Sequence, residues 1–232
     1  MCGFTVKPEW SERLKASGLD SLESLLAFSG GECLSLHKRG ATFRTRLADG
    51  TVVFIKRDHF TFVKEMLKDM LRLRRPAQKT VKERKAFEIA REAGFTTPEV
   101  IAFGTSSRFG LPHQAAMVML ELPGIALDAY IKEGHGDSQD MVAKAEATLA
   151  EMQSKGFDWP DHKPEHFLVQ PDGGIAVIDL ERLVRRSGPM PERKAAAQLA
   201  RFRRLLPEIP NAKQSECKNE NPRQIPMETA DS

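Results

Sequence analysis

The sequence predicts an α+β fold with two lobes, in which an antiparallel sheet precedes a minimal helical lobe. In the first half of the chain, short β-branched runs are separated by turn residues, as in 51–56 after the Ala-Asp-Gly turn at 48–50, which is the pattern of a β-meander. In the second half, apolar residues recur every three or four positions over 141–155, which indicates an amphipathic helix. With 232 residues, 41% of them hydrophobic, the chain can bury a substantial core.

Local signals place the elements of the N-lobe. Apolar residues at helical spacing over 10–28 predict two short helical turns, which Gly18 separates. Pro76 is expected to end one helix because proline cannot continue the hydrogen-bond ladder, and Gly94 is expected to close the turn after the next. The predicted strands lie at 33–37, 42–47, 51–56, 98–103 and 115–120, and the predicted helices at 60–73 and 80–90.

The C-lobe is expected to be small and mostly helical. Residues 121–124 have the composition of a hinge, and Gly156 is expected to end the second helix of the lobe. The predicted helices lie at 127–132, 141–155 and 192–206. We therefore divide the chain into an N-lobe with an N-terminal helical extension (1–122), a reduced helical C-lobe (123–210) and a tail (211–232) whose polar composition predicts disorder.

Three polar residues in the second half of the chain have the spacing of a phosphoryl-transfer site. Asp161 is followed by His166 five residues later and by Asp179 eighteen residues later. A protein-kinase-like site has an Asp that accepts a hydroxyl proton, a metal-binding side chain five residues on, and a second metal-binding Asp beyond a hairpin. The spacing predicts Asp161 as the proton acceptor and Asp179 as the main metal ligand, with Glu181 as a further candidate carboxylate.

A lysine and a glutamate in the first half of the chain complete this pattern. The apolar run 51–56 ends in Lys56, as does the strand that carries the ATP-phosphate lysine of kinases. Such a lysine needs an acidic partner, for which Glu83 is preferred and Glu88 is the alternative. Each feature alone is typical of an ordinary surface turn, a solvated lysine or a helix ion pair. Their common order along the chain is what favours a kinase.

The segments that carry these residues, taken together, resemble a known enzyme family. They are Phe-Ile-Lys-Arg at 54–57, Lys-Glu-Arg at 82–84, Gly-Phe-Thr-Thr-Pro at 94–98, Glu-Leu-Pro-Gly at 121–124, His-Phe-Leu at 166–168 and Ile-Asp-Leu-Glu-Arg at 178–182. In this order they resemble the lipopolysaccharide core kinase family, which includes Kdo and heptose kinases. The resemblance spans 34–206. It implies a bilobal protein-kinase-like fold, ATP with Mg²⁺ or Mn²⁺, and transfer of the γ-phosphate to a sugar hydroxyl of the lipopolysaccharide inner core.

Two segments depart from the protein-kinase pattern. Trp-Pro at 159–160 stands where His-Arg precedes the catalytic Asp, so the usual anchor for a phosphorylated activation loop is missing. The segment 34–43, in the place of the glycine-rich loop, contains Gly40 as its one glycine. Backbone amides near Gly40, with Lys38 or Arg39, are expected to approach the phosphates.

His166 stands where protein kinases carry Asn. Imidazole is a poorer ligand than a carboxylate for a hard ion such as Mg²⁺. Three roles therefore stay open for His166: it binds Mn²⁺, contacts a phosphate, or orients Asp161.

Contacts to both substrates are predicted near the hinge and the catalytic loop. Main-chain groups of Glu121 and Leu122 are expected to hydrogen-bond the adenine edge. Lys163 is close enough in sequence to Asp161 to contact the transferring phosphoryl group. The guanidinium fork suits an acceptor's phosphate or carboxylate groups, and a cluster of this kind is offered by Arg182, Arg185 and Arg186.

Charge, cysteine usage and hydropathy narrow the class of protein further. A net charge of +3 is too small for an electrostatic nucleic-acid binder. The three cysteines form no C-x-x-C unit, and therefore predict neither a disulfide framework nor a zinc site. Without a signal-like N-terminus or a long apolar run, we expect a cytoplasmic monomer. The basic amphipathic segment 60–75 is expected either to pack on the N-lobe or to contact the anionic inner membrane peripherally.

Three other functions remain open at this level. A protein Ser/Thr kinase also uses Asp-x-Lys-Pro-Glu, the pattern at 161–165. An aminoglycoside-type kinase would accept small soluble amino sugars. A pseudokinase that binds partners in a nucleotide-dependent way would tolerate the departures at Trp159, His166 and the glycine-poor loop.

Overall fold

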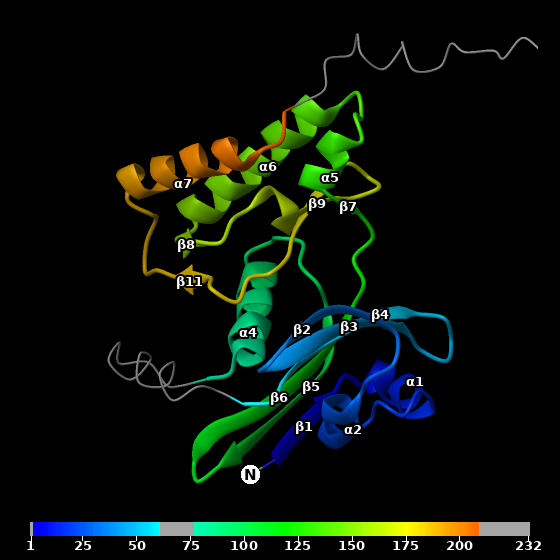
Figure 1. Cartoon of the computed structure of the whole chain (residues 1–232). Coiled ribbons are helices and arrows are strands. Elements are labelled where there is room, and N and C mark those ends of the chain that lie inside the picture. The colour runs from blue at the N-terminus through cyan, green and yellow to red at the C-terminus, as the bar shows by residue number, and fades with distance from the viewer. Residues whose placement is uncertain (1, 61–76, 209–232) are drawn as a thin grey trace, which may run out of the picture.

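The computed structural model describes residues 2–60 and 77–208. Figure 1 shows two lobes, with the sheet and its flanking helices in one and most of the other helices in the second. The predicted α+β class is confirmed by the antiparallel sheet of the first lobe and the helices of the second. The predicted helix at 60–73 and the tail at 211–232 fall outside the described residues, apart from Phe60.

The N-lobe is built on a six-stranded antiparallel sheet with the strand order β1-β5-β6-β4-β3-β2. The strands are β1 (Cys2–Val6), β2 (Glu32–His37), β3 (Gly40–Arg46), β4 (Val52–Asp58), β5 (Val100–Arg108) and β6 (Leu111–Leu120). The five strands predicted from sequence are present with shifted ends. Strand β1 was not predicted, and it extends the sheet by pairing with β5.

The two faces of this sheet are covered by different helices because neighbouring strand residues point to opposite sides. The N-terminal elements η1 (Pro8–Trp10), α1 (Ser11–Ala16) and α2 (Leu22–Ala27) share one core with Val118 of β6. Helix α4 (Lys79–Glu92) packs on the other face, where Phe87 shares a core with Met117 and Met119. Burying a side chain such as Phe87 stabilises the fold by about 1.5–3 kcal/mol. The second face is the one that borders the C-lobe (Figure 1).

The C-lobe combines three helices with short strands. The helices are α5 (Leu127–Lys132), α6 (Ser138–Ser154) and α7 (Glu192–Leu205), close to the three predicted ranges. One small sheet contains β7 (Ile125–Ala126), β9 (Phe167–Val169) and β10 (Ile175–Val177), and the other pairs β8 (Phe157–Asp158) with β11 (Val184–Arg185). The 3₁₀ turn η2 (Pro164–His166) precedes β9. These short strands hold the polar segment 161–181 in place.

The two lobes share one core and are also linked through the main chain at Thr96. Residues of α4 and β6 belong to the same buried cluster as residues of α5, α6 and the segment 161–181. The Val177 N–H of β10 donates to the Thr96 carbonyl at 2.9 Å. The strand that leads to Asp179 is therefore fixed against the segment that follows α4.

The domain limits at residues 122 and 210 stay predictions, although β6 ends at Leu120 and the C-lobe sheet begins with β7. The membrane contact predicted for 60–75 involves residues that the structure does not describe, except Phe60. Within the described ranges, the helices lack the combination of length and apolar character that crossing a bilayer requires.

Candidate active site

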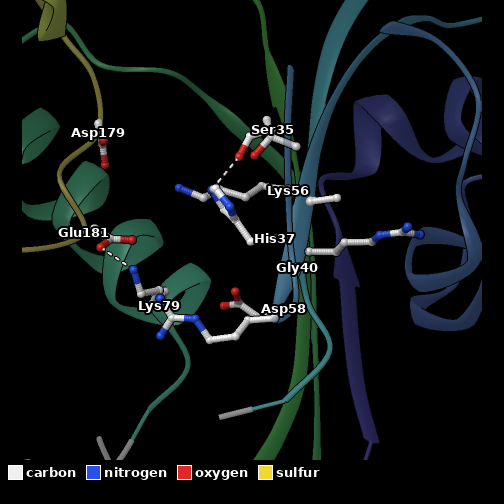
Figure 2. Close-up of a pocket in the computed structure, with 12 residues that line it drawn as sticks. Ser35, His37, Gly40, Lys56, Asp58, Lys79, Asp179 and Glu181 are labelled. Atoms are coloured by element: carbon white, nitrogen blue, oxygen red, sulfur yellow. Dashed lines mark hydrogen bonds and ion pairs between the residues drawn. The ribbon is translucent and has the colours of Figure 1, made fainter. Parts of the chain in front are cut away.

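A cavity of about 340 Å³ opens between the N-lobe sheet and the segment after β10. Figure 2 shows Ser35, His37 and Lys56 on the sheet side, facing Asp179 and Glu181 on the other side. The complete lining consists of Ser35, His37, Arg39, Gly40, Ala41, Thr42, Lys56, Arg57, Asp58, Lys79, Asp179 and Glu181. Two of the residues predicted for opposite ends of one site, Lys56 and Asp179, therefore share a cavity.

Lys56 lies near the end of β4 and forms an ion pair with Glu83 of α4. The distance from Lys56 Nζ to Glu83 Oε2 is 2.5 Å, and Glu83 is 3% exposed. Burial lowers the pKa of the Lys56 ammonium, but Glu83, Asp179 and Glu181 outweigh it, so that the pKa is raised above its usual value. Burial raises the pKa of Glu83 to about 6 against the opposing effect of Lys56. At neutral pH both partners are therefore charged.

Glu83, and not Glu88, is the residue of α4 that contacts Lys56. Glu88 is exposed and pairs with Arg84 one turn earlier on the same helix. The two glutamates differ in direction because they are five residues apart on a helix with 3.6 residues per turn. Of the two sequence candidates, the structure places the preferred one beside the lysine.

Asp161, His166 and Asp179 form a cluster of potential metal ligands. One ligand atom from each lies within 4.8 Å of the others. The His166 ring places Nδ1 2.6 Å from the Asp161 carbonyl oxygen and Nε2 3.4 Å from Asp179 Oδ2. Because a carbonyl oxygen only accepts hydrogen bonds, the proton of the ring lies on Nδ1 and the lone pair of a neutral ring is on Nε2. The imidazole therefore directs its ligand atom toward Asp179.

The donor atoms of this cluster suit a divalent cation. Two carboxylates supply the hard oxygen ligands that Mg²⁺ and Mn²⁺ prefer, and a neutral imidazole suits Mn²⁺ better than Mg²⁺. The Asp179 side chain is 39% exposed and faces the cavity, so that a phosphate-bound cation can reach it. The backbone of Asp179 has φ of 55°, a left-handed conformation that Asp adopts more readily than bulky residues.

The segment that carries Asp161 is held by a buried tryptophan and a buried histidine. Trp159 is fully buried; its ring stacks on His166 and contacts the Phe167 ring at a tilt. The His162 ring is 1% exposed and contacts the carbonyl oxygens of Trp159 and, at 2.8 Å, Gln198 of α7. These contacts place the aspartate without the arginine that protein kinases use before it. The sequence around His162 carries no signal that predicts this role.

Gly40 has a packing requirement as well as a place in the cavity lining. It begins β3, and a Cβ atom there would lie 1.9 Å from the Arg57 carbonyl oxygen. The absence of a side chain therefore lets β3 pair closely with β4, where Gly40 lies opposite Asp58. Its expected contact with phosphate stays a prediction.

The hinge residues lie outside the 340 Å³ cavity. The Glu121 N–H donates to the Val52 carbonyl at 3.2 Å, and the Glu121 side chain accepts a hydrogen bond from Arg44 Nε at 2.7 Å. An adenine contact through the Glu121 N–H would therefore compete with the sheet. The Glu121 carbonyl and the main chain of Leu122 remain as the predicted contacts.

Two predicted contributors have ion-pair partners. Lys163 Nζ lies 3.1 Å from Glu165 Oε1, and the hydrogen bond and charge of Glu165 raise the pKa of the Lys163 ammonium. Glu181 lies 2.8 Å from Lys79 Nζ at the start of α4, as Figure 2 shows. Glu181 is thus used to connect the lobes and is not part of the cluster around Asp179.

The predicted arginine cluster divides into residues with different neighbours. The Arg185 guanidinium lies 4.3 Å above the Phe157 ring, and Arg186 Nη1 is 3.9 Å from Asp158. Arg182 is exposed in the turn that follows Glu181. Of the three, Arg182 is therefore the best placed to contact an anionic acceptor.

A sheet-based N-lobe with a paired lysine, facing two aspartates of a small C-lobe, defines a protein-kinase-like phosphotransferase. The chain matches the model of the lipopolysaccharide kinase (Kdo/WaaP) family over residues 35–220. This chain belongs to that family, and the suspected resemblance is confirmed. It is a kinase that uses ATP and a divalent metal, in agreement with the predicted enzyme class.

Two relatives illustrate the similarity. Over 179 residues, the chain is 30% identical to the lipopolysaccharide core heptose(I) kinase WaaP of Escherichia coli, covering 71% of this chain and 67% of that protein. A solved structure of WaaP in complex with acyl carrier protein has a TM-score of 0.64 at 20% identity, covering 92% of this chain and 85% of that one. The second similarity supports the fold.

Proposed function

We propose that this kinase transfers the γ-phosphoryl group of ATP to a sugar hydroxyl of the lipopolysaccharide inner core, with a heptose as the preferred acceptor and Kdo as the alternative. The observation that carries the proposal is the convergence of Lys56, Asp161 and Asp179. Lys56 and Asp179 line one cavity, and Asp161 lies in the same ligand cluster as Asp179. Heptose is preferred because a relative at 30% identity is a heptose(I) kinase.

The residue roles in this proposal follow from charge and position. Lys56, oriented by Glu83, binds the α- and β-phosphates as a point charge. Asp161 orients the acceptor hydroxyl and accepts its proton as the phosphoryl group transfers. Lys163 neutralises charge on that group. Main-chain groups of Leu122 and the Glu121 carbonyl contact the adenine edge. Most of the rate enhancement is attributed to positioning and charge neutralisation.

Asp179 and His166 would hold the divalent cation, for which we propose Mg²⁺ or Mn²⁺. A bound cation of this kind neutralises charge on the β- and γ-phosphates during transfer. The His166 Nε2 atom supports the assignment because it points at Asp179, while Nδ1 is occupied by the Asp161 carbonyl.

The small C-lobe favours a glycolipid acceptor over a folded protein. The described part of the C-lobe has α5, α6 and α7 as its helices, which offer little helical surface to dock a protein substrate. Arg182 supplies an exposed cation for an anionic core sugar, one residue after Glu181 of the cavity lining. We place the reaction at the cytoplasmic side of the inner membrane, where ATP and lipid-linked sugars meet, and we expect a monomer.

Transfer of label from γ-labelled ATP to a panel of acceptors tests this function. The panel contains a heptose-bearing core glycolipid, the same lipid truncated to Kdo, free heptose, an amino sugar and a generic Ser/Thr peptide, each with Mg²⁺ and with Mn²⁺. Label on the heptose-bearing lipid that disappears in Asp161→Asn supports the proposal. Label only on the truncated lipid would reassign the acceptor to Kdo, and label only on the peptide or amino sugar would contradict it.

A further inference from the structure

A buried aspartate connects the strand of Lys56 to the helix of Glu83 at a second point. Asp58 ends β4, two residues after Lys56, and both side chains line the cavity because residues two apart in a strand share a face. Asp58 is 8% exposed. A carboxylate buried to this extent needs hydrogen bonds to offset its desolvation.

These hydrogen bonds come from the first turn of α4. Asp58 Oδ2 accepts hydrogen bonds from the Thr80 N–H and the Thr80 hydroxyl, each at 2.8 Å. The first N–H groups of a helix lack partners within the helix, and a carboxylate there also interacts favourably with the helix dipole. Asp58 thus caps α4 from a different element. The residue at the N-cap position, Gln78, makes no side-chain capping bond.

Gln78 fixes the same end of the helix to the rest of the sheet. Its Nε2 atom donates to the Gln114 carbonyl of β6 at 3.0 Å, and Gln78 is 4% exposed. The start of α4 is therefore connected to β4 and to β6 by buried hydrogen bonds. Asp58 and Lys79 both line the cavity, as Figure 2 shows.

Two connections between one strand and one helix restrict the helix more than either alone. Lys56 and Asp58 are about 6.6 Å apart along the strand, and Thr80 and Glu83 are about 4.5 Å apart along the helix axis. A rotation or outward movement of α4 that separates Glu83 from Lys56 must also stretch the contacts between Asp58 and Thr80. The contacts between Asp58 and Thr80 do not involve the lysine, so they do not depend on whether phosphates also contact Lys56.

We infer that Asp58 is a positioning residue that caps α4 from β4 and thereby holds Glu83 beside Lys56 with or without bound nucleotide. The inference rests on the proposed role of Lys56 and Glu83 in nucleotide binding. It makes the active position of α4 a built-in property of the fold. This agrees with the Trp-Pro sequence at 159–160, which lacks the usual anchor for control by a phosphorylated loop.

A double-mutant cycle on ATP binding tests the inference. The dissociation constant of ATP with Mn²⁺ is measured by titration calorimetry for wild type, Asp58→Ala, Glu83→Gln and the double variant. Asp58→Ala alone is expected to weaken binding about tenfold, the effect of losing one charge-assisted contact. In the Glu83→Gln background the same change is expected to have less than about a twofold further effect, because residues that act as one unit are not additive.

Conservative variants separate positioning from a general loss of stability. Asp58→Asn keeps an oxygen acceptor for Thr80 and is expected to restore affinity to within about threefold of wild type, since Asn caps helices as well as Asp. Thr80→Val, which keeps the N–H and loses the hydroxyl, is expected to weaken binding about threefold, while Thr80→Ser does not. Asp49→Ala, which removes another N-lobe carboxylate that accepts a main-chain N–H bond, is the matched control and should bind ATP normally.

The outcomes distinguish the inference from the proposed function. Independent effects of Asp58→Ala in both backgrounds, or a folded Asp58→Asn that binds as poorly as Asp58→Ala, would overturn the positioning role alone. Normal ATP affinity in Glu83→Gln would overturn the role of the Lys56–Glu83 pair and the inference with it. If Asp58→Ala does not fold, the same double-mutant cycle on the ATP dissociation constant is measured with Thr80→Val in place of Asp58→Ala, and Thr80→Ser serves as its control.

Discussion

The two lobes contribute halves of the site that are held in different ways. In the N-lobe half, Lys56 is matched by Glu83 and the helix is capped by Asp58, so that the charges are paired and largely buried. In the C-lobe half, Asp161 and Asp179 are only partly buried, and their loop is held through main-chain carbonyls and stacked rings. The paired half orients a cation that is part of the chain. In the other half, the two carboxylates are accessible to a cation and a hydroxyl that arrive with the substrates.

This difference predicts which changes reduce turnover and which reduce binding. In the proposed mechanism, a group in the C-lobe half acts on the reacting atoms, so its loss should lower kcat more than ATP affinity. A group in the N-lobe half acts on the bound nucleotide in that mechanism, so its loss should lower ATP affinity.

The largest effect is expected for Asp161→Asn. The amide is isosteric but cannot accept the hydroxyl proton, so kcat should fall about 10³-fold, within the 10²–10⁴ range of general base catalysis. The dissociation constant of ATP, measured by calorimetry, should stay within about twofold because the proposed role of Asp161 is to contact the acceptor and not the nucleotide. A loss of kcat below tenfold would remove Asp161 from the role of proton acceptor.

His166→Asn tests how the C-lobe half selects its metal. Asn keeps a donor for the Asp161 carbonyl but loses the imidazole Nε2 atom that points at Asp179. We expect affinity for Mn²⁺ to fall about 10-fold to 100-fold, with a smaller change for Mg²⁺, as measured by metal titration of the ATP complex. Asp179→Asn, which removes a charged ligand, should lower the affinity for both Mn²⁺ and Mg²⁺. Unchanged Mn²⁺ affinity in His166→Asn would assign the ring to positioning of Asp161.

Many of the elements and residues in both halves of the site are predictable from the sequence. The features that are not predictable have a common physical cause. The runs around Lys56 and Asp179 carry local signals of strand and hairpin, so the sequence predicts their elements. The kinase pattern adds the pairing of Lys56 with Glu83, because such a lysine needs an acidic partner. Strand β1 was missed because it is defined by its pairing with β5, roughly a hundred residues away in sequence. Long-range contacts of this kind leave no periodic pattern in the chain.

The contacts that position the site were missed for the same reason. Asp58 meets Thr80 across 22 residues, and His162 meets the Gln198 carbonyl across 36 residues. From sequence, Asp58 is an ordinary polar residue at a strand end and His162 a neighbour of a motif. A weak signal was available for Asp58, since it lies two residues after Lys56 and therefore on the same face of the strand.

Glu83→Gln tests whether the N-lobe half acts through charge. The pKa of Glu83 is raised to about 6 by burial, so the carboxylate gains a proton and loses its charge as the pH falls through that value. ATP affinity of the wild type should therefore decrease from pH 7 to pH 5. Glu83→Gln should bind ATP about tenfold more weakly at pH 7 and show no transition near pH 6. Fluorescence titration over this pH range measures both.

Glu88→Gln is the matched control for this pH profile. Glu88 is on the same helix but exposed and paired with Arg84, so its replacement should leave the affinity and the transition unchanged. A Glu83→Gln enzyme that keeps the transition near pH 6 would assign that transition to another group.

The smallest effect is expected at the hinge, where the two halves join. The Arg44 side chain lies 2.7 Å from Glu121 and 3.9 Å from Glu32, but Arg44 and Glu121 are about one third exposed, at 36% and 32%. Exposed ion pairs are screened by solvent and contribute little, so Arg44→Ala should change the ATP dissociation constant and kcat by less than about twofold. The hinge main chain stays in place because the Glu121 N–H is held by the Val52 carbonyl. A larger loss, measured in the same calorimetric and transfer assays, would mean that the side-chain pair, and not the sheet, sets the position of the Glu121 carbonyl that we propose contacts adenine.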